Sequence, residues 1–536
     1  MKKAKWYILL AALLLVVGGI YYYVTLPAIN IHSAGLWTFL LTLCLFAMAV
    51  IALLSLKSGK KIEKAITKSV PLKIAAGVTA VLAVIYFLGS LLSSPIINAG
   101  KYQKLLTVQE REFTEDIKEV NYNQIPLLDK ESATLLGNRK MGSMVDMVSQ
   151  FEVSNLYTQI NYNDEPVRIT PLTYASPIKW LTNQSSGIPA YIKIDMATQE
   201  TECVKLEQPI KYSEAEYFNR NIYRHLRFRY PTYIFDNLSF EIDEEGVPYW
   251  VCPVKKFNIG LFGGQTIGSV VLCNAQTGET QEYAIEDVPQ WIDRVYSADL
   301  LVELYDYHGT LKHGYFNSIL GQKDCLQTTS GYNYIALEDD VWVYTGITSL
   351  NSDQSIVGFV LMNQRTMETR FYSVEGAIEY SAMDSAEGQV QNLGYQASFP
   401  LLLNIANEPT YFMVLKDDAG LVKKYAMVNI QRYQWVAIGD TVADCEKAYI
   451  SLLNTNGISS AQMGNALEVS GTITTIAPIV IDGNTHYYVC ISGNEEIFDF
   501  NMTDAAVLDI LKYKEGDTIK ISYAKGGSVN EVLEIK

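Results

Sequence analysis

Asn274-Ala-Gln-Thr-Gly-Glu-Thr280 is the middle copy of a motif that occurs three times in this chain of 536 residues. The other copies are Asp195-Met-Ala-Thr-Gln-Glu-Thr201 and Asn363-Gln-Arg-Thr-Met-Glu-Thr369, at spacings of 79 and then 89 residues. Nine residues after the first Thr of each copy stands a Glu, and five residues further on stands an aromatic residue. A register kept over this length indicates a structural repeat.

Each copy ends an apolar run rich in Val, Ile and Tyr, which predicts a β-hairpin with the motif at its turn. The leading Asp or Asn is expected to accept from the backbone two residues on, as in an Asx-turn, with the Thr on the returning strand. These turn residues are Asp195, Thr198, Asn274, Thr277, Asn363 and Thr366. Helix-like stretches follow at 213–226, 293–307 and 382–393, so residues 122–455 are predicted to be α+β modules of antiparallel sheet plus helix.

The turn and its flanking strands, preceded by a hairpin of the Gly246-Val-Pro-Tyr-Trp250 kind, resemble the PepSY class over residues 180–455. This resemblance implies small extracytoplasmic α+β modules, often membrane-tethered, that bind or restrain proteases. The first and third copies lack the Gly of the motif. The whole chain is also similar to uncharacterised multipass membrane proteins of bacteria with Gram-positive-style envelopes, a resemblance that implies no function.

Three apolar runs near the N-terminus lack acidic and basic side chains and are long enough to cross a bilayer, at residues 6–24, 36–56 and 74–92. The loop at 57–73 carries six Lys, whereas the loop at 25–35 carries no Lys or Arg. The positive-inside rule therefore predicts a cytoplasmic N-terminus and an extracytoplasmic domain after the third helix. Residues 1–95 are predicted to be a membrane anchor, and the polar residues 96–121 are expected to form a stalk.

Charge divides at the end of this anchor. Residues 1–100 carry nine Lys and one acid, a net of 9 − 1 = +8, and the remainder carries 42 − 9 = 33 basic and 58 − 1 = 57 acidic residues, a net of −24. Such an acidic domain disfavours nucleic acid and anionic lipid, because both bind basic surfaces. The expected partners are the lipid bilayer around the anchor and an envelope protein or cell-wall ligand outside.

The C-terminal residues 466–536 are predicted to form a separate small β-barrel. Strand-like runs at 467–476, 486–492 and 496–501 precede a helix at 504–511 and two more strands at 518–523 and 529–535. The order βββαββ is that of an OB-fold, with an SH3-like barrel as the alternative.

A local basic cluster interrupts the acidic domain. Arg220, Arg224 and Arg227 would share one helix face, and Arg229 follows closely. The cluster is a candidate patch for a carboxylate, a wall polymer or an acidic partner. The alternative is pairing with neighbouring carboxylates of the chain itself.

Two cysteines, Cys252 and Cys273, are equidistant from a Gly-rich centre near Gly263. A hairpin folded there would place them opposite each other, so they form either a disulfide or two small buried side chains.

Catalytic signatures are missing from the sequence. No Gly-x-Ser-x-Gly elbow or Ser-x-x-Lys pair occurs, and the five His have no metal-site spacing, so no cofactor or metal is expected. We therefore expect a non-enzymatic, membrane-anchored binding or scaffold protein of the bacterial cell envelope. The alternatives are an envelope hydrolase or protease regulator, with catalytic carboxylates among the many acids, and an accessory subunit of a membrane complex or transporter.

Overall fold

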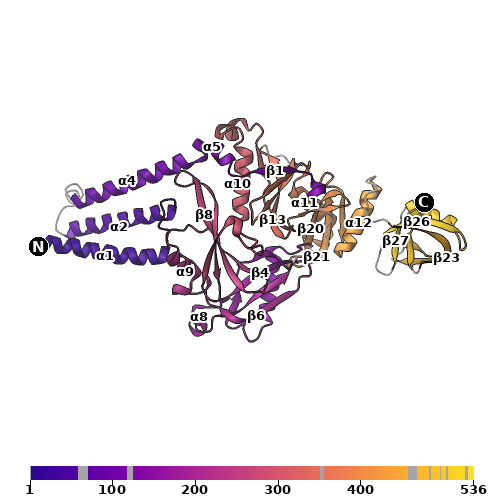
Figure 1. The fold of residues 1–536 in the computed structure, drawn as a ribbon, viewed down its shortest axis with the longest axis horizontal. Helices are drawn as coiled ribbons and strands as arrows, with labels where there is room; N and C mark the ends of the chain where they lie inside the picture. Colours follow the sequence, from indigo (N-terminus) through magenta and orange to yellow (C-terminus); the bar gives the residue numbers. More distant parts are fainter. Residues whose placement is uncertain are drawn as a thin grey trace. The chain divides into compact units, whose positions relative to one another are not determined.

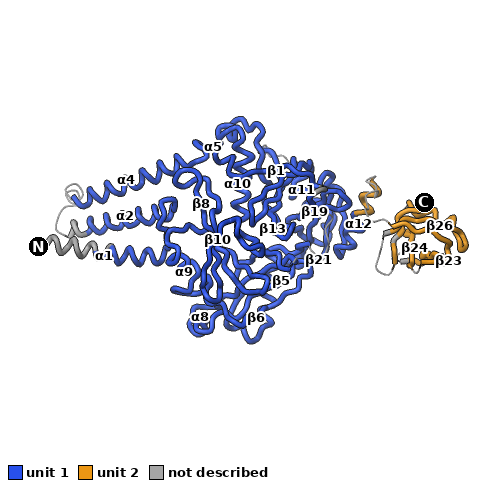
Figure 2. The backbone as a smooth tube through the Cα atoms, in the orientation of Figure 1, with its two compact units in different colours: residues 1–449 blue, residues 450–536 orange. Residues whose placement is uncertain are grey.

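The computed structural model describes residues 2–57, 70–117, 125–163, 165–350, 355–456, 467–481, 484–494, 496–502, 505–524 and 529–536. They form two bodies, Met1–Tyr449 and Ile450–Lys536, whose elements are drawn in Figure 1 and which are coloured separately in Figure 2. Among the described residues, the first body holds the N-terminal helices, four large sheets and one two-stranded sheet, and the second is a five-stranded β domain.

Three long helices open the chain: α1 (Lys2–Thr25), α2 (Ala34–Lys57) and α4 (Val70–Ser93). By length and composition, α2 and α4 can each cross a membrane, with mean hydropathies of 2.5 and 2.2 over their apolar windows. The described side chains of α1 form a shorter apolar stretch, Leu15–Thr25. Two of the three predicted spans are thus present as apolar helices, and the first crossing stays a prediction.

Four modules follow, each a helix and then an antiparallel four-stranded meander. In modules 1 and 2 these are α7 (Lys130–Gly142) with β3 (Thr158–Tyr162), β4 (Glu165–Tyr174), β5 (Ile188–Asp195) and β6 (Thr201–Ile210), and α9 (Ile222–Arg229) with β7 (Ser239–Ile242), β8 (Pro248–Ile259), β9 (Gly263–Asn274) and β10 (Thr280–Ala284). In modules 3 and 4 they are α10 (Ala298–Thr310) with β12 (Asn333–Leu337), β13 (Asp340–Ser349), β15 (Gly358–Asn363) and β16 (Thr369–Tyr372), and α11 (Glu379–Gln389) with β19 (Leu401–Ile405), β20 (Glu408–Lys416), β21 (Val422–Asn429) and β22 (Val436–Gly439).

Shorter elements extend these modules. They are β2 (Phe151–Val153) and α8 (Pro177–Asn183) in module 1, η2 (Phe218–Arg220) before α9, η3 (Ile285–Asp287), η4 (Asn317–Gly321) and β11 (Leu326–Thr328) around α10, the pair β14 (Ser355–Ile356) and β17 (Gly376–Ala377), η5 (Gln391–Leu393) and β18 (Gln396–Ala397) after α11, and the closing helix α12 (Val442–Thr455).

One helix packs between each pair of successive sheets, so the modules stack as a solenoid. Leu226 of α9 lies in the core between the first and second sheets, Leu301 of α10 between the second and third, and Ala386 of α11 between the third and fourth. Neighbouring residues Trp250 and Val251 of β8 face different cores. The inner sheets are therefore buried on both faces, which explains why β13 is buried along nearly its whole length.

The three motif turns have one geometry, which confirms the predicted Asx-turn. The predicted place of the motif Thr and Glu on the returning strand is wrong, because both lie in the turn and the strand begins at the Thr after the Glu, at Thr201, Thr280 and Thr369. Asp195 Oδ1 accepts from the backbone N of Ala197 at 2.8 Å and of Thr198 at 2.7 Å. The corresponding distances are 2.9 and 2.9 Å for Asn274 and 2.8 and 2.9 Å for Asn363. In each copy the Thr Oγ1 accepts from the backbone N of the motif Glu at 3.2 to 3.3 Å. The repeated residues therefore have a structural role.

The fourth module contains a copy of this turn that the sequence motif did not reveal. Asn429 Oδ1 accepts from the backbone N of Gln431 at 3.1 Å and of Arg432 at 2.9 Å, at the junction of β21 and β22. The backbone N of Asn429 then bonds to the carbonyl of Trp435, one residue later than in the other copies. A longer turn without the Thr and Glu removes the sequence signal while keeping the capping Asn.

The fifth position of the motif turn has positive φ in every copy, with values of 65° at Gln199, 75° at Gly278 and 67° at Met367. Gly278→Ala should destabilise the first body by about 1–2 kcal/mol, because a side chain is strained at this φ and its Cβ would lie 2.4 Å from the Tyr212 ring. Gln199→Gly should instead stabilise it by about 0.5 kcal/mol, since the same strain is relieved. Chemical denaturation measures the change in the free energy of unfolding for each variant. Changes of the same sign in the two variants would contradict this account.

The predicted stalk is wrong for the residues described up to 117. This segment forms α5 (Pro95–Gln103), β1 (Val108–Arg111) and α6 (Phe113–Asp116), and β1 joins the third sheet in parallel with β16. The side chains of Tyr102 and Leu106 are buried. The few apolar side chains of this segment are enough to hold it in a folded position, because the third sheet supplies most of the surface against which it packs.

A glycine-rich hairpin tip joins the second module to the anchor. Between β8 and β9, the backbone N atoms of Leu261 and Phe262 donate to Ser93 Oγ at the end of α4, at 2.8 and 3.1 Å. A Cβ on Gly260 or Gly263 would lie 2.4 Å or less from Ser93 atoms. These loop glycines therefore permit a close backbone approach to the helix.

Of the two alternatives for Cys252 and Cys273, the structure has two buried thiols and no disulfide: all seven cysteines are described and all are free. Cys252 lies opposite Val271 and Cys273 lies opposite Trp250. The hairpin turns two residues before Gly263 and carries a bulge, so the register differs from the symmetric one. Both thiols are buried in the first core, as the alternative reading expected.

The second body contains β23 (Leu467–Ile481), β24 (Asn484–Ile491), β25 (Ile497–Asn501), β26 (Thr518–Ala524) and β27 (Asn530–Ile535). Its pairing order, β23-β24-β25-β27-β26, closes on itself because β26 also pairs with β23. The predicted helix is a 3₁₀ helix, η6 (Ala505–Lys512), between β25 and β26. Phe498 and Phe500 are fully buried in this core.

Candidate anion-binding cavity

A cavity of about 360 Å³ lies within the first body, where residues of modules 1, 3 and 4 meet. Its polar lining includes Gln159 and Arg168 from module 1 and Arg294 from the segment before α10. Aromatic side chains supply much of the remaining wall, namely Tyr157, Tyr332, Tyr334, Phe399 and Phe412. A concave site with a few polar groups on aromatic walls is typical of small-molecule binding.

Arg168 is the unusual group in this lining. It lies on β4 opposite Gln159 of β3, and its side chain is 6% exposed. Its Nη2 donates to Gln159 Oε1 at 3.4 Å, a long contact, while its Nε has no hydrogen-bond partner. Burial lowers the pKa of Arg168, because a charged guanidinium is poorly solvated there. Arginine nevertheless stays charged in proteins, so the fold holds a buried cation without a carboxylate partner among the described residues.

The unpaired atoms in this lining are donors. Gln159 Nε2, like Arg168 Nε, has no partner among the described groups. The Tyr157 hydroxyl also lacks one, but it lies against Gly137 of α7 and is not counted as a cavity donor. Buried donors are nearly always satisfied in native proteins, so the missing partner is an acceptor, and beside a guanidinium an anionic oxygen fits best.

Charge around the cavity is positive in excess. Arg294 and Lys130 also line it, and within the described chain the Arg294 side chain makes no hydrogen bond or ion pair. The one carboxylate in the lining, that of Asp129, pairs with Lys416 and caps α7 through the backbone N of Ser132. Burial opposes ionisation of Asp129, yet these hydrogen bonds outweigh it and hold its pKa below the usual value. Asp129 is therefore bound directly to Lys416. Its charge also acts on Arg168, but no ion pair or hydrogen bond joins the two side chains among the described residues.

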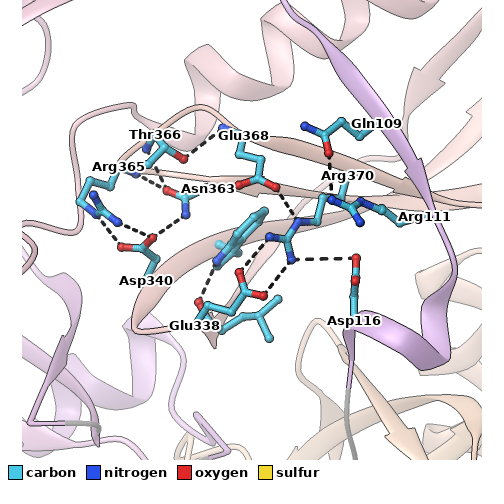
Figure 3. Close-up of polar contacts among 12 residues, drawn as sticks. Gln109, Arg111, Asp116, Glu338, Asp340, Asn363, Arg365, Thr366, Glu368 and Arg370 are labelled. Carbon is cyan, nitrogen blue, oxygen red and sulfur yellow. Dashed lines mark hydrogen bonds and ion pairs between the residues drawn. The ribbon is translucent and has the colours of Figure 1, made fainter. Parts of the chain in front are cut away.

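Other buried arginines of the same body are paired, as the third motif turn shows (Figure 3). Arg365 binds Asp340 through two contacts of 2.6 and 2.8 Å. Arg370 binds Glu338 and Glu368 at 2.8 Å each, and its guanidinium lies 4.4 Å from the centre of the Trp342 ring. Of the two buried arginines among the described residues, Arg370 binds carboxylates and Arg168 binds none, which favours an anionic ligand for Arg168.

Most arginines of the predicted patch donate hydrogen bonds to backbone carbonyls of the chain itself, and none of the four forms an ion pair with a carboxylate among the described residues. Arg220 donates to the carbonyl of Gln184 at 2.5 Å and Arg224 to that of Phe218 at 3.1 Å. Arg227 donates to Leu26 in the loop after α1 and to three carbonyls that follow α9. Arg229 is exposed and makes no hydrogen bond or ion pair within the described residues. The four side chains therefore do not form one open patch.

Two buried acids lie outside the cavity, where modules 1 and 2 meet. Glu241 accepts from the backbone N of Asp293 at 3.0 Å, and Asp293 Oδ2 accepts from that of Asn161 at 2.6 Å. Asp293 Oδ1 has no partner. Burial raises the pKa of both carboxyls, and the charge of Glu241 raises the pKa of Asp293 further.

A carboxyl with a raised pKa makes the folded state bind more protons than the unfolded chain, so its contribution to stability falls as pH rises above about 3.9. Asp293→Asn keeps an acceptor for Asn161 and removes this titration. We expect the variant to match the native protein near pH 4 and to exceed it in Tm by a growing margin toward pH 8. Thermal melts across this range measure the difference, and a constant difference would contradict the assignment.

Arg168 and Arg294 were not predicted as site residues. The available signal is a lone charge within the apolar strand Pro166-Val-Arg-Ile-Thr-Pro171. That signal does not say whether a carboxylate from another module reaches the arginine, because the modules meet only in the folded stack. Among the described residues, no group of three or more His, Cys, Asp or Glu is placed to hold a metal.

No protein-family model matches the chain, and no curated protein matches it. Among solved structures, a point variant of Synechocystis apocarotenoid oxygenase matches at 8% identity over 56% of this chain and 67% of that chain, with a TM-score of 0.16. The N-terminal domain of Nup159 matches at 9% identity over 72% and 96%, with a TM-score of 0.12. At TM-scores this low the likeness carries no argument, so function is argued from the cavity itself.

Proposed function

We propose that this chain is a non-enzymatic, membrane-anchored binding protein of the bacterial cell envelope, whose cavity takes a ligand bearing a carboxylate or phosphate group. The observation that carries the proposal is Arg168, a buried guanidinium facing a cavity without an acidic partner. An unpaired buried charge costs several kcal/mol of stability. Binding of an anion explains why this loss of stability is tolerated, because the ligand brings the negative charge that the guanidinium lacks.

Binding is favoured over hydrolysis by the composition of the lining. Neither His nor Cys is among the lining residues, and the carboxylate of Asp129 is tied to Lys416. The hydroxyl of Ser398 accepts from the backbone N of Val414 and has no adjacent base in the lining. These groups suit recognition of an anion and do not form a nucleophile with a base.

The proposed setting is a three-span anchor with a cytoplasmic N-terminus and the solenoid outside. It rests on the six Lys between the second and third apolar runs. PepSY-like modules are supported by the repeated Asx-turn hairpins. An OB-like C-terminal domain is supported by the order β23-β24-β25-β27-β26, with a helix between β25 and β26.

The test is a ligand screen on the full chain in detergent. Thermal shifts with mono- and dicarboxylates, phosphate and sulfate, and with matched neutral amides, should reveal anions that raise Tm. Isothermal titration should then give one site per chain. The same anions should have no effect on Arg168→Gln, whereas Arg432→Gln, an exposed arginine of module 4 that stacks on Trp435 at 4.2 Å, should respond like the native protein. Stabilisation by neutral analogues, or equal responses in both variants, would reject the anion site.

A further inference from the structure

The anchor side of the solenoid carries an unusual concentration of exposed apolar side chains. Ile178 and Leu181 of α8 are 72% and 62% exposed, and Phe218 and Phe228 beside α9 are 62% and 53% exposed. One ring contact links α8 to the segment before α9, since the Trp180 ring of α8 lies 6.0 Å from the Phe218 ring. Figure 1 shows α8 and α9 at the end of the domain where α1 arrives. This surface, from Ile178 to Phe228, is called the anchor-side face.

The anchor-side face is continuous with α1. Phe228 lies 6.4 Å from the Tyr22 ring and 6.1 Å from the Tyr23 ring, both near the C-terminal end of that helix. The guanidinium of Arg224 lies 4.4 Å from the centre of the Tyr23 ring. Aromatic and arginine side chains at the end of an apolar helix are typical of the headgroup level of a bilayer.

A cleft lies in this face, lined by Tyr23, Asn219, Arg224, His225, Phe228 and Arg229. Two of its donors are unused: Arg224 Nε is buried without a partner, and Arg229 makes no hydrogen bond or ion pair with the described chain. His225 Nε2 lies 2.8 Å from the carbonyl of Gly278. Burial lowers the pKa of His225, so the two arginines carry the positive charge.

We propose that this cleft binds the phosphate of an anionic phospholipid in the outer leaflet, with Arg224 and Arg229 on the phosphate and the aromatic rings among the upper acyl carbons. The inference rests on the membrane anchor of the proposed function but not on its cavity. A lipid fits better than a soluble phosphate because the cleft is walled by Tyr23 and Phe228 and opens beside an apolar helix. The net acidic charge of the domain does not oppose this, because the lining of the cleft contains two arginines and no acidic side chain, and salt screens more distant charges.

The test is native mass spectrometry of the full chain, extracted from membranes and exchanged into detergent with equimolar phosphatidylglycerol and phosphatidylcholine. The native protein should retain phosphatidylglycerol preferentially. Arg229→Gln should reduce this preference about fivefold, the effect of one arginine near a membrane surface, and Arg224→Gln combined with it should abolish the preference. Arg229→Lys should retain most of it, because the charge remains.

Two control variants, a competition with inorganic phosphate and a membrane fractionation accompany this measurement. Arg432→Gln and Arg168→Met, both outside the cleft, should leave lipid preference unchanged, which separates this site from the cavity. An unchanged preference in Arg229→Gln would overturn the proposal. Displacement of the lipid by millimolar inorganic phosphate would also overturn it, by showing a site for soluble phosphate. Failure of the native chain to fractionate with membranes would instead reject the anchor itself.

Discussion

Arg168→Met is expected to make the protein more stable and to abolish anion binding. The native side chain keeps a charge in a buried position without a carboxylate partner, and methionine fills a similar volume without that charge. Replacing buried charged groups by apolar ones commonly stabilises proteins by about 1–4 kcal/mol. Loss of one member of a buried charge pair costs a complex about 2–5 kcal/mol, so affinity for the anion should fall at least about 30-fold.

Chemical denaturation and isothermal titration on the same Arg168→Met preparation measure the two effects. If the variant is more stable than the native protein and no longer binds the anion, Arg168 serves ligand binding and not folding. Loss of stability would mean that Arg168 has a structural partner, and the proposal of an anion cavity would then fail. Arg168→Lys serves as a conservative comparison, because it keeps the charge but loses the bidentate geometry.

Arg370→Met is expected to have the opposite effect on stability and to lower the free energy of unfolding by about 2 kcal/mol, a value reduced by solvent screening because the Glu338 side chain is 57% exposed. Burial opposes the charge of Arg370, but the hydrogen bonds that it donates to Glu338 and Glu368 outweigh this and raise its pKa. Removing the guanidinium leaves these carboxylates without their partner and takes away the contact with the Trp342 ring. It also removes a weaker link to Asp116, 3.9 Å away.

The two methionine variants form a matched pair, measured under the same denaturation conditions. Both remove one arginine from a strand of the same body, and they differ in whether carboxylates are present around it. Partial recovery by Arg370→Lys is expected, since one of the two ion pairs can still form. A loss below about 1 kcal/mol in Arg370→Met would show that solvent screens the network in Figure 3.

Local features of the chain were predictable because each depends on a few adjacent residues. The Asx-turns at Asp195, Asn274 and Asn363 follow from a side chain that bonds its own backbone, and the helices after them follow from apolar periodicity. Features that depend on partners were missed. Residues 108–111 form an edge strand because β16 is available to pair with them, and the fourth turn at Asn429 is recognisable by its hydrogen bonds alone.

The candidate site residues likewise depend on partners that are distant in the sequence. The apolar helices, the charge division, the repeat and the α+β class can be predicted from the sequence, because composition and short-range spacing encode them. Three other features follow from packing alone: Cys252 lies opposite Val271, Arg227 binds the loop after α1, and Arg168 lines a cavity without a carboxylate partner of its own. The environment of a buried charge is made by the residues around it, and in a stacked repeat these residues come from modules far apart in the chain.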